Sequence, residues 1–299
     1  MININPAIPK AKGAYIVGGS IRDLILGRIP TDYDIAVLLF PEKYASDLAS
    51  CVNGHVVKIG KQNQMIYRVV SENSTFDISV IAGKTIEDDL VKRDFTVNAI
   101  GYDLSSEKII DLFGGINDLS TKKIRMVSKE IFIKDSVRLI RAYRIAAILD
   151  FEIESETAHA IANNVKLITK AAGERIKAEF FKILSCPKAY GYIHQMNEKG
   201  LLFEIFPELT ALQGCIQNKH HAYDVLDHSL TAFSQLEILL NEKKFNAGSM
   251  GLPIPDMDKE RSALLKYSIL LHDIGKPSTL TVGYEGNIHF FGHDIIGAE

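Results

Sequence analysis

Residues 18–27 read GGSIRDLILG, and residues 32–34 read DYD. The apolar run 15–17 before the two glycines predicts a strand, and a helix is expected from about Ser20. A glycine pair at such a turn lets backbone N–H groups and the helix N-terminus approach an anion such as a triphosphate. Arg22, one turn into that helix, adds a forked donor for phosphate oxygens. We therefore expect a nucleotide-binding turn at Gly18, Gly19, Ser20 and Arg22.

Two carboxylates follow this turn on the next predicted strand. Asp32 and Asp34 are two residues apart, so their side chains project from the same face of the strand. Neighbouring carboxylates repel each other, and a divalent cation relieves this repulsion and bridges phosphate oxygens. A solvated turn is the alternative for an isolated D-x-D. The glycines and Arg22 upstream favour a Mg²⁺ site at Asp32 and Asp34.

Length and composition indicate a folded protein with about two cores. The chain has 299 residues, of which 46% are hydrophobic and 24% charged. These values exclude disordered, collagen-like and disulfide-scaffold classes. Cys51, Cys186 and Cys215 lie far apart and form no C-x-x-C pair, which argues against a disulfide framework and a thiolate zinc site. The sequence has no membrane-spanning run and no signal peptide, so we expect a cytoplasmic protein without a membrane partner.

The charge is unevenly distributed along the chain. With 34 basic and 37 acidic residues the net charge is −3, which excludes a polycation attracted to nucleic acid over its whole surface. Residues 121–145 nevertheless hold eight lysines and arginines against two acidic residues. A nucleic-acid partner is therefore expected to bind a local basic patch.

The hydrophobic pattern changes along the chain. Residues 13–112 mix strands with short helices, whereas apolar residues recur at helical spacing from Ser128 onward. A turn is predicted over 114–121, with a domain boundary near 125, and a Gly- and Pro-rich loop over 245–253. The predicted strands of the first part include 15–17, 33–37 and 75–80.

GGSIRDLILG followed by DYD resembles the first motif of class II tRNA nucleotidyltransferases and bacterial poly(A) polymerases, of the DNA polymerase beta-like superfamily. The resemblance implies an α+β fold: a head with a small mixed β-sheet, then an all-helical neck and body. We expect a catalytic head over 1–125, a nucleobase-recognition neck over 126–200, and a helical body with a partial HD-type region over 201–299. Two-metal transfer is implied, with two Mg²⁺ on Asp32 and Asp34. Asp77 matches a third acidic catalytic residue, and a surface strand residue is its alternative.

Two further motifs extend the resemblance. Residues 92–99, KRDFTVNA, are similar to the family's R-R-D-F-T-x-N-A block, with Lys92 in place of the first arginine. This implies nucleotide contacts or support of the site by Arg93, Asp94 and Asn98. Residues 135–144, DSVRLIRAYR, resemble the E-D-x-x-R motif, whose Asp and Arg read the incoming base. Such polar readout discriminates strongly between bases.

Asp135 and Arg138 match that motif, three residues apart on a predicted helix. An Asp/Arg pair on a solvated helix is the alternative. Lys134 stands where the family usually has Glu, which leaves the choice of base open. Arg141 and Arg144 are also expected to bind nucleotide. Residues 175–182 fit the family's R-x-x-x-E-x-x-K element, in which Arg175 and Glu179 are read as an i,i+4 clasp.

Histidines in the last third resemble an HD-domain signature: His228, His272 with Asp273, and His293. HD proteins bind a divalent metal with such residues and hydrolyse phosphoesters. The sequence ends at Glu299, before the distal Asp ligand of a full HD fold. We therefore expect a truncated helical support rather than an active hydrolase, with a second divalent metal as the alternative.

These features together predict a template-independent nucleotidyltransferase that adds CMP, AMP or both from CTP and ATP to the tRNA 3′ end. CC-only, A-only and poly(A) addition are alternatives within the same chemistry. A metal-dependent HD phosphohydrolase and a non-catalytic RNA-binding protein are rivals from other classes. Neither oligomeric state nor order of addition follows from the sequence.

Overall fold

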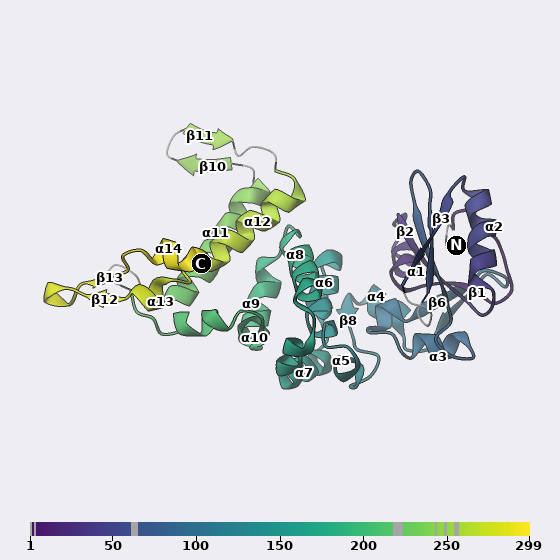
Figure 1. Ribbon diagram of the computed structural model, residues 1–299, viewed down its shortest axis with the longest axis horizontal. Coiled ribbons are helices and arrows are strands. Elements are labelled where there is room, and N and C mark those ends of the chain that lie inside the picture. Colours follow the sequence, from purple (N-terminus) through teal and green to yellow (C-terminus); the bar gives the residue numbers. More distant parts are fainter. Residues whose placement is uncertain are drawn as a thin grey trace. The chain divides into compact units, whose positions relative to one another are not determined.

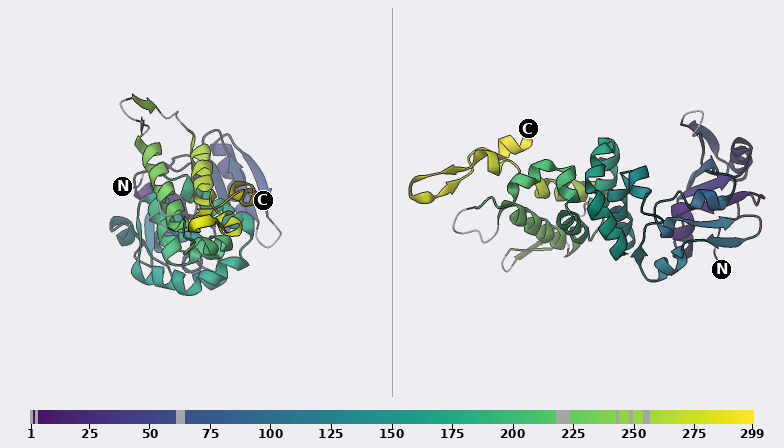
Figure 2. Two further views of the ribbon diagram at one scale, coloured as in Figure 1. Left: turned by 90° about the vertical axis from the view of Figure 1, so that its left-hand side faces the viewer. Right: turned by 90° about the horizontal axis from the view of Figure 1, so that it is seen from below.

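The computed structural model describes residues 2, 4–60, 65–217, 224–242, 244–247, 250–253 and 257–299 (Figure 1). It contains two compact units. The head unit comprises Met1–Ile131 and Glu152–Thr157, and the helical unit comprises Phe132–Phe151 and Ala158–Glu299. A sheet followed by helices confirms the predicted α+β class, and the further division at residue 200 stays a prediction (Figure 2).

A seven-stranded mixed sheet forms the centre of the head unit, in the order β3-β4-β5-β2-β1-β6-β7. β2 and β5 run parallel, and every other neighbouring pair is antiparallel. The central strands match the predicted positions. The strands are β1 (Ala14–Val17), β2 (Asp32–Val37), β3 (His55–Ile59), β4 (Ile66–Val70), β5 (Thr75–Val80), β6 (Ile100–Asp103) and β7 (Lys108–Asp111).

Strand β2 separates apolar from acidic side chains. Tyr33 and Ile35 are buried, whereas Asp32 and Asp34 are exposed, as the two-residue period of a strand requires. The Tyr33 ring stacks on Phe76 of β5, with ring centroids 5.0 Å apart. Burial of the apolar face therefore determines that both carboxylates lie on the opposite face.

Helices α1, α2 and α3 contact strands of the sheet. α1 begins at Gly18, two residues before the predicted start. A two-stranded parallel pair, β8 (Lys123–Ile124) and β9 (Glu152–Ile153), completes the head unit. The helices are α1 (Gly18–Ile25), α2 (Pro41–Cys51), α3 (Ile86–Leu90), the 3₁₀ turn Thr96–Asn98, and α4 (Gly115–Ser120).

The turn predicted over 114–121 is wrong, because most of this stretch is helix α4. The Asp111 carboxylate accepts hydrogen bonds from the first backbone N–H groups, Gly115 N at 2.8 Å and Ile116 N at 2.9 Å. Asp118 is buried and accepts a 2.7 Å hydrogen bond from Thr96 Oγ1. Asp118, which suggested a turn, thus supports the helix through a partner 22 residues earlier in the sequence.

The helical unit confirms the predicted change of pattern. α6 packs on α8, and α11 lies beside α12 (Figure 1). Tyr143, Phe180 and Phe233 are among its largest buried side chains. The α-helices of this part are α5 (Ile131–Lys134), α6 (Arg138–Leu149), α7 (Ser155–Asn164), α8 (Gly173–Leu184), α9 (Tyr190–Glu198), α10 (Leu201–Ile205), α11 (Val225–Glu242), α12 (Lys259–Leu271), α13 (Lys276–Thr279) and α14 (His293–Ala298). The 3₁₀ helices are Val165–Lys170, Pro207–Leu212 and Tyr284–Gly286.

Two hairpins interrupt these helices. β10 (Lys244–Ala247) pairs with β11 (Met250–Pro253), and β12 (Thr281–Val282) pairs with β13 (Ile288–His289), both antiparallel. The loop predicted over 245–253 is therefore wrong for the residues that the structure describes. Glycine and proline content suggested the loop, whereas backbone pairing between the two segments makes them strands.

A buried ion pair connects three parts of the helical unit. Lys266 of α12 is 2% exposed and donates to Glu237 of α11 at 2.9 Å and to the Cys186 carbonyl at 2.7 Å. The Glu237 carboxylate also accepts from Ala189 N and Tyr190 N, at 2.6 and 3.1 Å, where α9 begins. Hydrogen bonds to both charges compensate for their loss of hydration.

Among the described residues, every helix is too short or too polar to cross a membrane.

Candidate active site

The glycine turn between β1 and α1 lies against the acidic face of β2. Val17 is the register partner of Asp34, and Gly18 follows with φ +70°. A Cβ on Gly18 would lie 3.0 Å from Asp34 Oδ2 and 2.8 Å from Arg93 Nη1. Gly18 therefore meets two requirements, a left-handed backbone and room for a carboxylate and a guanidinium.

Ser20 connects this turn to β2. Its buried hydroxyl donates to the Val17 carbonyl and accepts from Asp34 N, both at 2.9 Å. These bonds hold the backbone of Asp34 next to the glycines. A structural role thus accounts for Ser20, and its contact with a nucleotide stays a prediction.

Three carboxylates share one face of the sheet. The parallel register of β2 and β5 pairs Asp34 with Asp77, and Asp32 lies two residues before Asp34 on the same face. Loss of hydration raises the pKa of the Asp34 carboxyl. The charges of Asp77 and Asp32 raise this pKa further, against the opposing charge of Arg93.

A divalent metal fits these residues. Asp32 and Asp34 offer carboxylate oxygens, which are the ligands that Mg²⁺ prefers, on the face of β2 opposite the buried Tyr33 and Ile35. Asp77 and Asp32 both disfavour the ionised form of Asp34, and the charges of Arg93 and Arg22 oppose them; a bound cation would relieve the repulsion among the three carboxylates. Asp77 differs, because both of its oxygens accept hydrogen bonds from Arg68, each at 2.7 Å.

Basic and amide side chains lie beside the glycine turn in a hydrogen-bonded chain. Arg22 Nη1 donates to Asn98 Oδ1 at 2.8 Å, and Asn98 Nδ2 donates to Asp94 Oδ1 at 3.0 Å. Arg93 donates from Nε and Nη2 to Asp89 Oδ2, at 3.0 and 2.9 Å. The structure thus brings the four residues predicted from two separate motifs to the same turn. Asp94 and Asn98 hold Arg22 in place.

The second predicted cluster lies in the helical unit. Asp135 lies just before α6, which begins at Arg138, so the expectation that both residues share a helix is wrong. Asp135 accepts two hydrogen bonds from Arg175, at 3.0 and 2.8 Å. Burial opposes ionisation of Asp135, but the Arg175 guanidinium holds its pKa below the ordinary value. Lys134 is exposed at the end of α5.

The predicted i,i+4 clasp on α8 is also wrong. Arg175 pairs with Asp135, whereas Glu179 pairs with Arg141 Nε at 3.1 Å and with Arg144 Nε at 2.5 Å. Both α8 residues therefore contact partners 35 to 40 residues earlier, as packing of α8 on α6 allows. Sequence spacing along one helix carries no information about such a partner.

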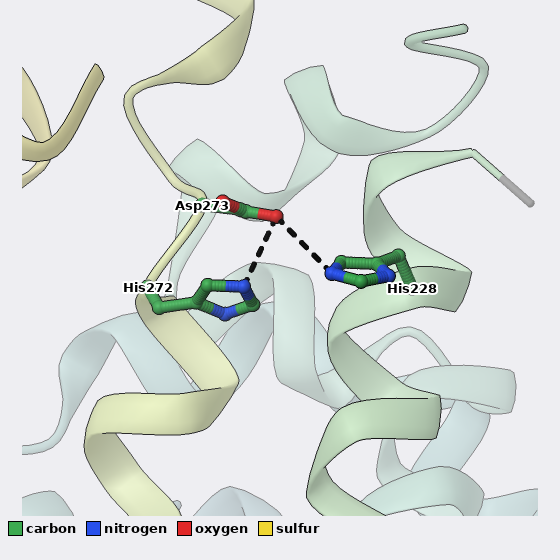
Figure 3. Close-up of side chains that lie close together, drawn as sticks. All are labelled: His228, His272 and Asp273. Atoms are coloured by element: carbon green, nitrogen blue, oxygen red, sulfur yellow. Dashed lines mark ion pairs between the residues drawn. The ribbon is translucent and has the colours of Figure 1, made fainter. Parts of the chain in front are cut away.

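The predicted histidine cluster is assembled (Figure 3). Nε2 of His272 and Nε2 of His228 lie 3.1 and 3.6 Å from Asp273 Oδ2, and His293 Nε2 lies 3.5 Å from Asp273 Oδ1. One ligand atom from each of His228, His272 and Asp273 lies within 4.8 Å of the others. Asp273 is 1% exposed.

Neighbouring groups orient this cluster. The Nδ1 atoms of His272 and His293 contact the backbone carbonyls of Ile269 and Phe290, at 2.9 and 2.8 Å. A protonated Nδ1 in these bonds leaves Nε2 as the ligand atom. Lys276 donates to Asp273 Oδ2 at 2.7 Å. Burial opposes ionisation of Asp273, yet His272 and Lys276 hold its pKa at about 2.

The sequence motifs do not point to several residues of these sites, notably Arg68 and Lys276. Arg68 interrupts the apolar strand IYRVV, which is a signal for a polar partner across the sheet. The strand register that pairs it with Asp77 is a tertiary property.

Two family models match the chain. Residues 14–125 match the poly A polymerase head domain, and residues 150–213 match the probable RNA and SrmB-binding site of polymerase A. The chain is 35% identical over 301 residues to an A-adding tRNA nucleotidyltransferase of Deinococcus radiodurans, covering 98% of this chain and 64% of that protein. It is 31% identical over 294 residues to a CC-adding tRNA nucleotidyltransferase of Thermus thermophilus, covering 96% and 62%.

A solved structure shares the fold. The Thermotoga maritima CCA-adding enzyme complexed with tRNA matches with a TM-score of 0.66 and 26% identity, over 85% of this chain and 58% of that chain. The chain thus spans less than two thirds of the length of each of these relatives. The two family models, the similar relatives and the shared fold all indicate the same family. The chain belongs to the class II tRNA nucleotidyltransferase and poly(A) polymerase family.

Proposed function

We propose that this chain adds CMP, AMP or both from CTP and ATP to the 3′ end of tRNA without a template. The observation that carries the proposal is the Asp32 and Asp34 pair, on one face of β2 beside the Gly18 turn. Relatives named for A addition and for CC addition support the reaction type, and the tRNA-bound relative supports the acceptor. Poly(A) addition is the alternative within the family.

Members of the family are typically metal-dependent, and we assign two Mg²⁺ to Asp32 and Asp34. Mg²⁺ held there would lower the pKa of the RNA 3′-hydroxyl and offset the charge of the triphosphate. The 3′-oxygen would bond to the α-phosphorus as the bond between the α- and β-phosphates breaks and pyrophosphate leaves. Backbone N–H groups at Gly18 and Gly19 and the guanidinium of Arg22 bind phosphate oxygens. Arg93 adds positive charge beside Asp34.

We further propose that Asp135 and Arg138, in the helical unit, select the base of the incoming nucleotide. Asp135 supplies carboxylate acceptors and Arg138 guanidinium donors for the Watson–Crick edge of cytosine or adenine. The Arg175 pair orients the Asp135 carboxylate. Arg141 and Arg144 pair with Glu179 and contribute positive charge to the same segment. A wrong base leaves a donor or acceptor unpaired, which is the physical basis of selection.

Primer extension tests the proposal directly. We expect the protein to elongate tRNA that ends before the CCA, after one C or after two C, with release of pyrophosphate. CTP and ATP are supplied singly, and product lengths on a sequencing gel identify CC, A or full CCA addition. Asp32→Ala is the inactive control. Absence of elongation with every tRNA and nucleotide would refute the assignment. Addition of several AMP residues to tRNA that already carries CCA would favour poly(A) addition.

The histidine cluster favours a second activity. His228, His272 and Asp273, with His293 beside them, offer ligands for a divalent transition metal. The Nδ1 contacts of two histidines leave Nε2 atoms for the metal. We propose that this cluster holds a metal that activates water for phosphoester hydrolysis.

Separation of the two sites by mutation tests this second activity. We expect Ni²⁺-loaded protein to open 2′,3′-cyclic CMP, and His272→Ala to abolish this hydrolysis while CTP incorporation into tRNA persists. Asp32→Ala should do the opposite, because its site lies in the head unit. Calorimetry with Ni²⁺ measures binding independently of turnover. Equal hydrolysis by His272→Ala and the parent protein would refute the activity.

A further inference from the structure

Arg68 lies at one side of the acidic face and belongs to no motif that the sequence suggested. It is on β4, where its register partner across the antiparallel pair is Asp77 of β5. On its other side Asp77 is the register partner of Asp34. Asp77 is therefore placed between an arginine and an aspartate that we assign to metal binding.

The contact between Arg68 and Asp77 is bidentate. Arg68 Nε donates to Asp77 Oδ1 and Arg68 Nη2 donates to Oδ2, both at 2.7 Å. Parallel hydrogen bonds of this kind define the orientation of both groups. The Asp77 side chain is 26% exposed, compared with 42% for Arg68. Both carboxylate oxygens thus face an arginine rather than the space beside Asp32 and Asp34.

The guanidinium acts on the whole acidic face. The hydrogen bonds that Arg68 donates to Asp77 raise the pKa of Arg68 most, and the charges of Asp32 and Asp34 raise it further. Among these four side chains the three carboxylates contribute −3 and Arg68 contributes +1, a sum of −2, and Arg93 beside Asp34 adds a further positive charge. Removing either member of the pair therefore changes the charge that a cation meets by one unit.

We infer that Arg68 is a positioning residue that holds Asp77 outside the metal ligand set, so that Asp32 and Asp34 alone ligate the metals. This inference rests on the proposed nucleotidyl transfer. Asp77 then acts through charge and through Arg68 rather than as a third ligand. The competing arrangement is one in which Asp77 releases Arg68 and ligates a metal.

Direct Mn²⁺ binding distinguishes the two arrangements. Free Mn²⁺ is measured by electron paramagnetic resonance on the full chain without nucleotide. Every protein carries His272→Ala, so that the histidine cluster contributes little to the binding. The variants are Asp77→Asn, Arg68→Gln and the double variant Arg68→Gln/Asp77→Asn. Lys58→Gln removes a positive charge from neighbouring strand β3, where Lys58 pairs with Glu42, and is the matched control.

The expected pattern is compensatory. Asp77→Asn leaves Arg68 unneutralised and weakens Mn²⁺ binding by about 10-fold, and Arg68→Gln strengthens it by a similar factor. The double variant restores the original net charge and ligand set, so its affinity returns to within about 3-fold of the parent. Arg68→Lys keeps the charge but loses the fork that orients both Asp77 oxygens, so it should bind Mn²⁺ more tightly than the parent, though by less than Arg68→Gln.

Each contrary result has a distinct meaning. A double variant that binds Mn²⁺ as weakly as Asp77→Asn, or more weakly, would show that Asp77 is itself a ligand and overturn the inference. Should Asp77→Asn fail to fold, unchanged or weaker binding by folded Arg68→Gln overturns it equally. If the parent binds no Mn²⁺, or Asp32→Asn binds it unchanged, the proposed function fails instead.

Discussion

Asp34→Asn is expected to reduce incorporation of CTP or ATP into tRNA by at least about 1,000-fold, while the protein remains folded. The substitution removes a charged ligand whose metal contributes several kcal/mol to the transition state, and each 1.36 kcal/mol corresponds to 10-fold in rate. Incorporation of labelled nucleotide, with tRNA and nucleotide near saturation, measures the loss.

The pKa of Asp34 makes a second, opposite prediction for the same variant. Folding raises the pKa of the Asp34 carboxyl, which means that its ionised form has a higher free energy in the native state than in the unfolded chain. The ionised form therefore lowers stability at pH above that pKa, and a neutral isostere removes this cost. We expect Asp34→Asn to unfold at the same temperature as the parent or higher, with lost activity.

A matched control uses an aspartate away from the site. Asp47 is exposed on α2, and Asp47→Asn should change neither transfer nor thermal stability. Asp34→Asn that keeps more than about a tenth of the parent rate would exclude Asp34 as a metal ligand. A large fall in its unfolding temperature would contradict the electrostatic argument.

Glu237→Ala is expected to lower the free energy of unfolding of the helical unit by about 3–5 kcal/mol. The substitution leaves the Lys266 ammonium buried with only the Cys186 carbonyl among the partners described above. It also removes the acceptor of Ala189 N and Tyr190 N at the start of α9. Urea denaturation followed by circular dichroism at 222 nm measures the change.

The two partners of this pair should differ. Lys266→Met leaves Glu237 with its two backbone donors, so it should cost less than Glu237→Ala. Glu260→Ala, exposed on α12, is the control and should be neutral. Equal stability of Glu237→Ala and the parent would show that the pair contributes nothing to folding.

The candidate site illustrates what local sequence contains. The glycine pair, Arg22 and the Asp32/Asp34 spacing lie within 17 residues, and strand periodicity alone predicted that both carboxylates share a face. The structure places Asp34 beside Gly18 and Arg22 beside Gly19. The secondary-structure prediction was wrong at α4 and at the β10–β11 hairpin. Side-chain hydrogen bonds at α4 and strand pairing at the hairpin outweigh the turn preference of the local glycine, proline and polar residues.

Chain order and residue spacing thus determined the strands of the central sheet, the helical second part and the identity of the glycine, aspartate and histidine motifs. Tertiary structure alone decided the partners: Arg68 with Asp77, Arg175 with Asp135, and His293 with Asp273. The reason is physical. Backbone periodicity is a property of neighbouring residues, whereas strand register and helix packing depend on burying apolar faces that lie far apart in the chain.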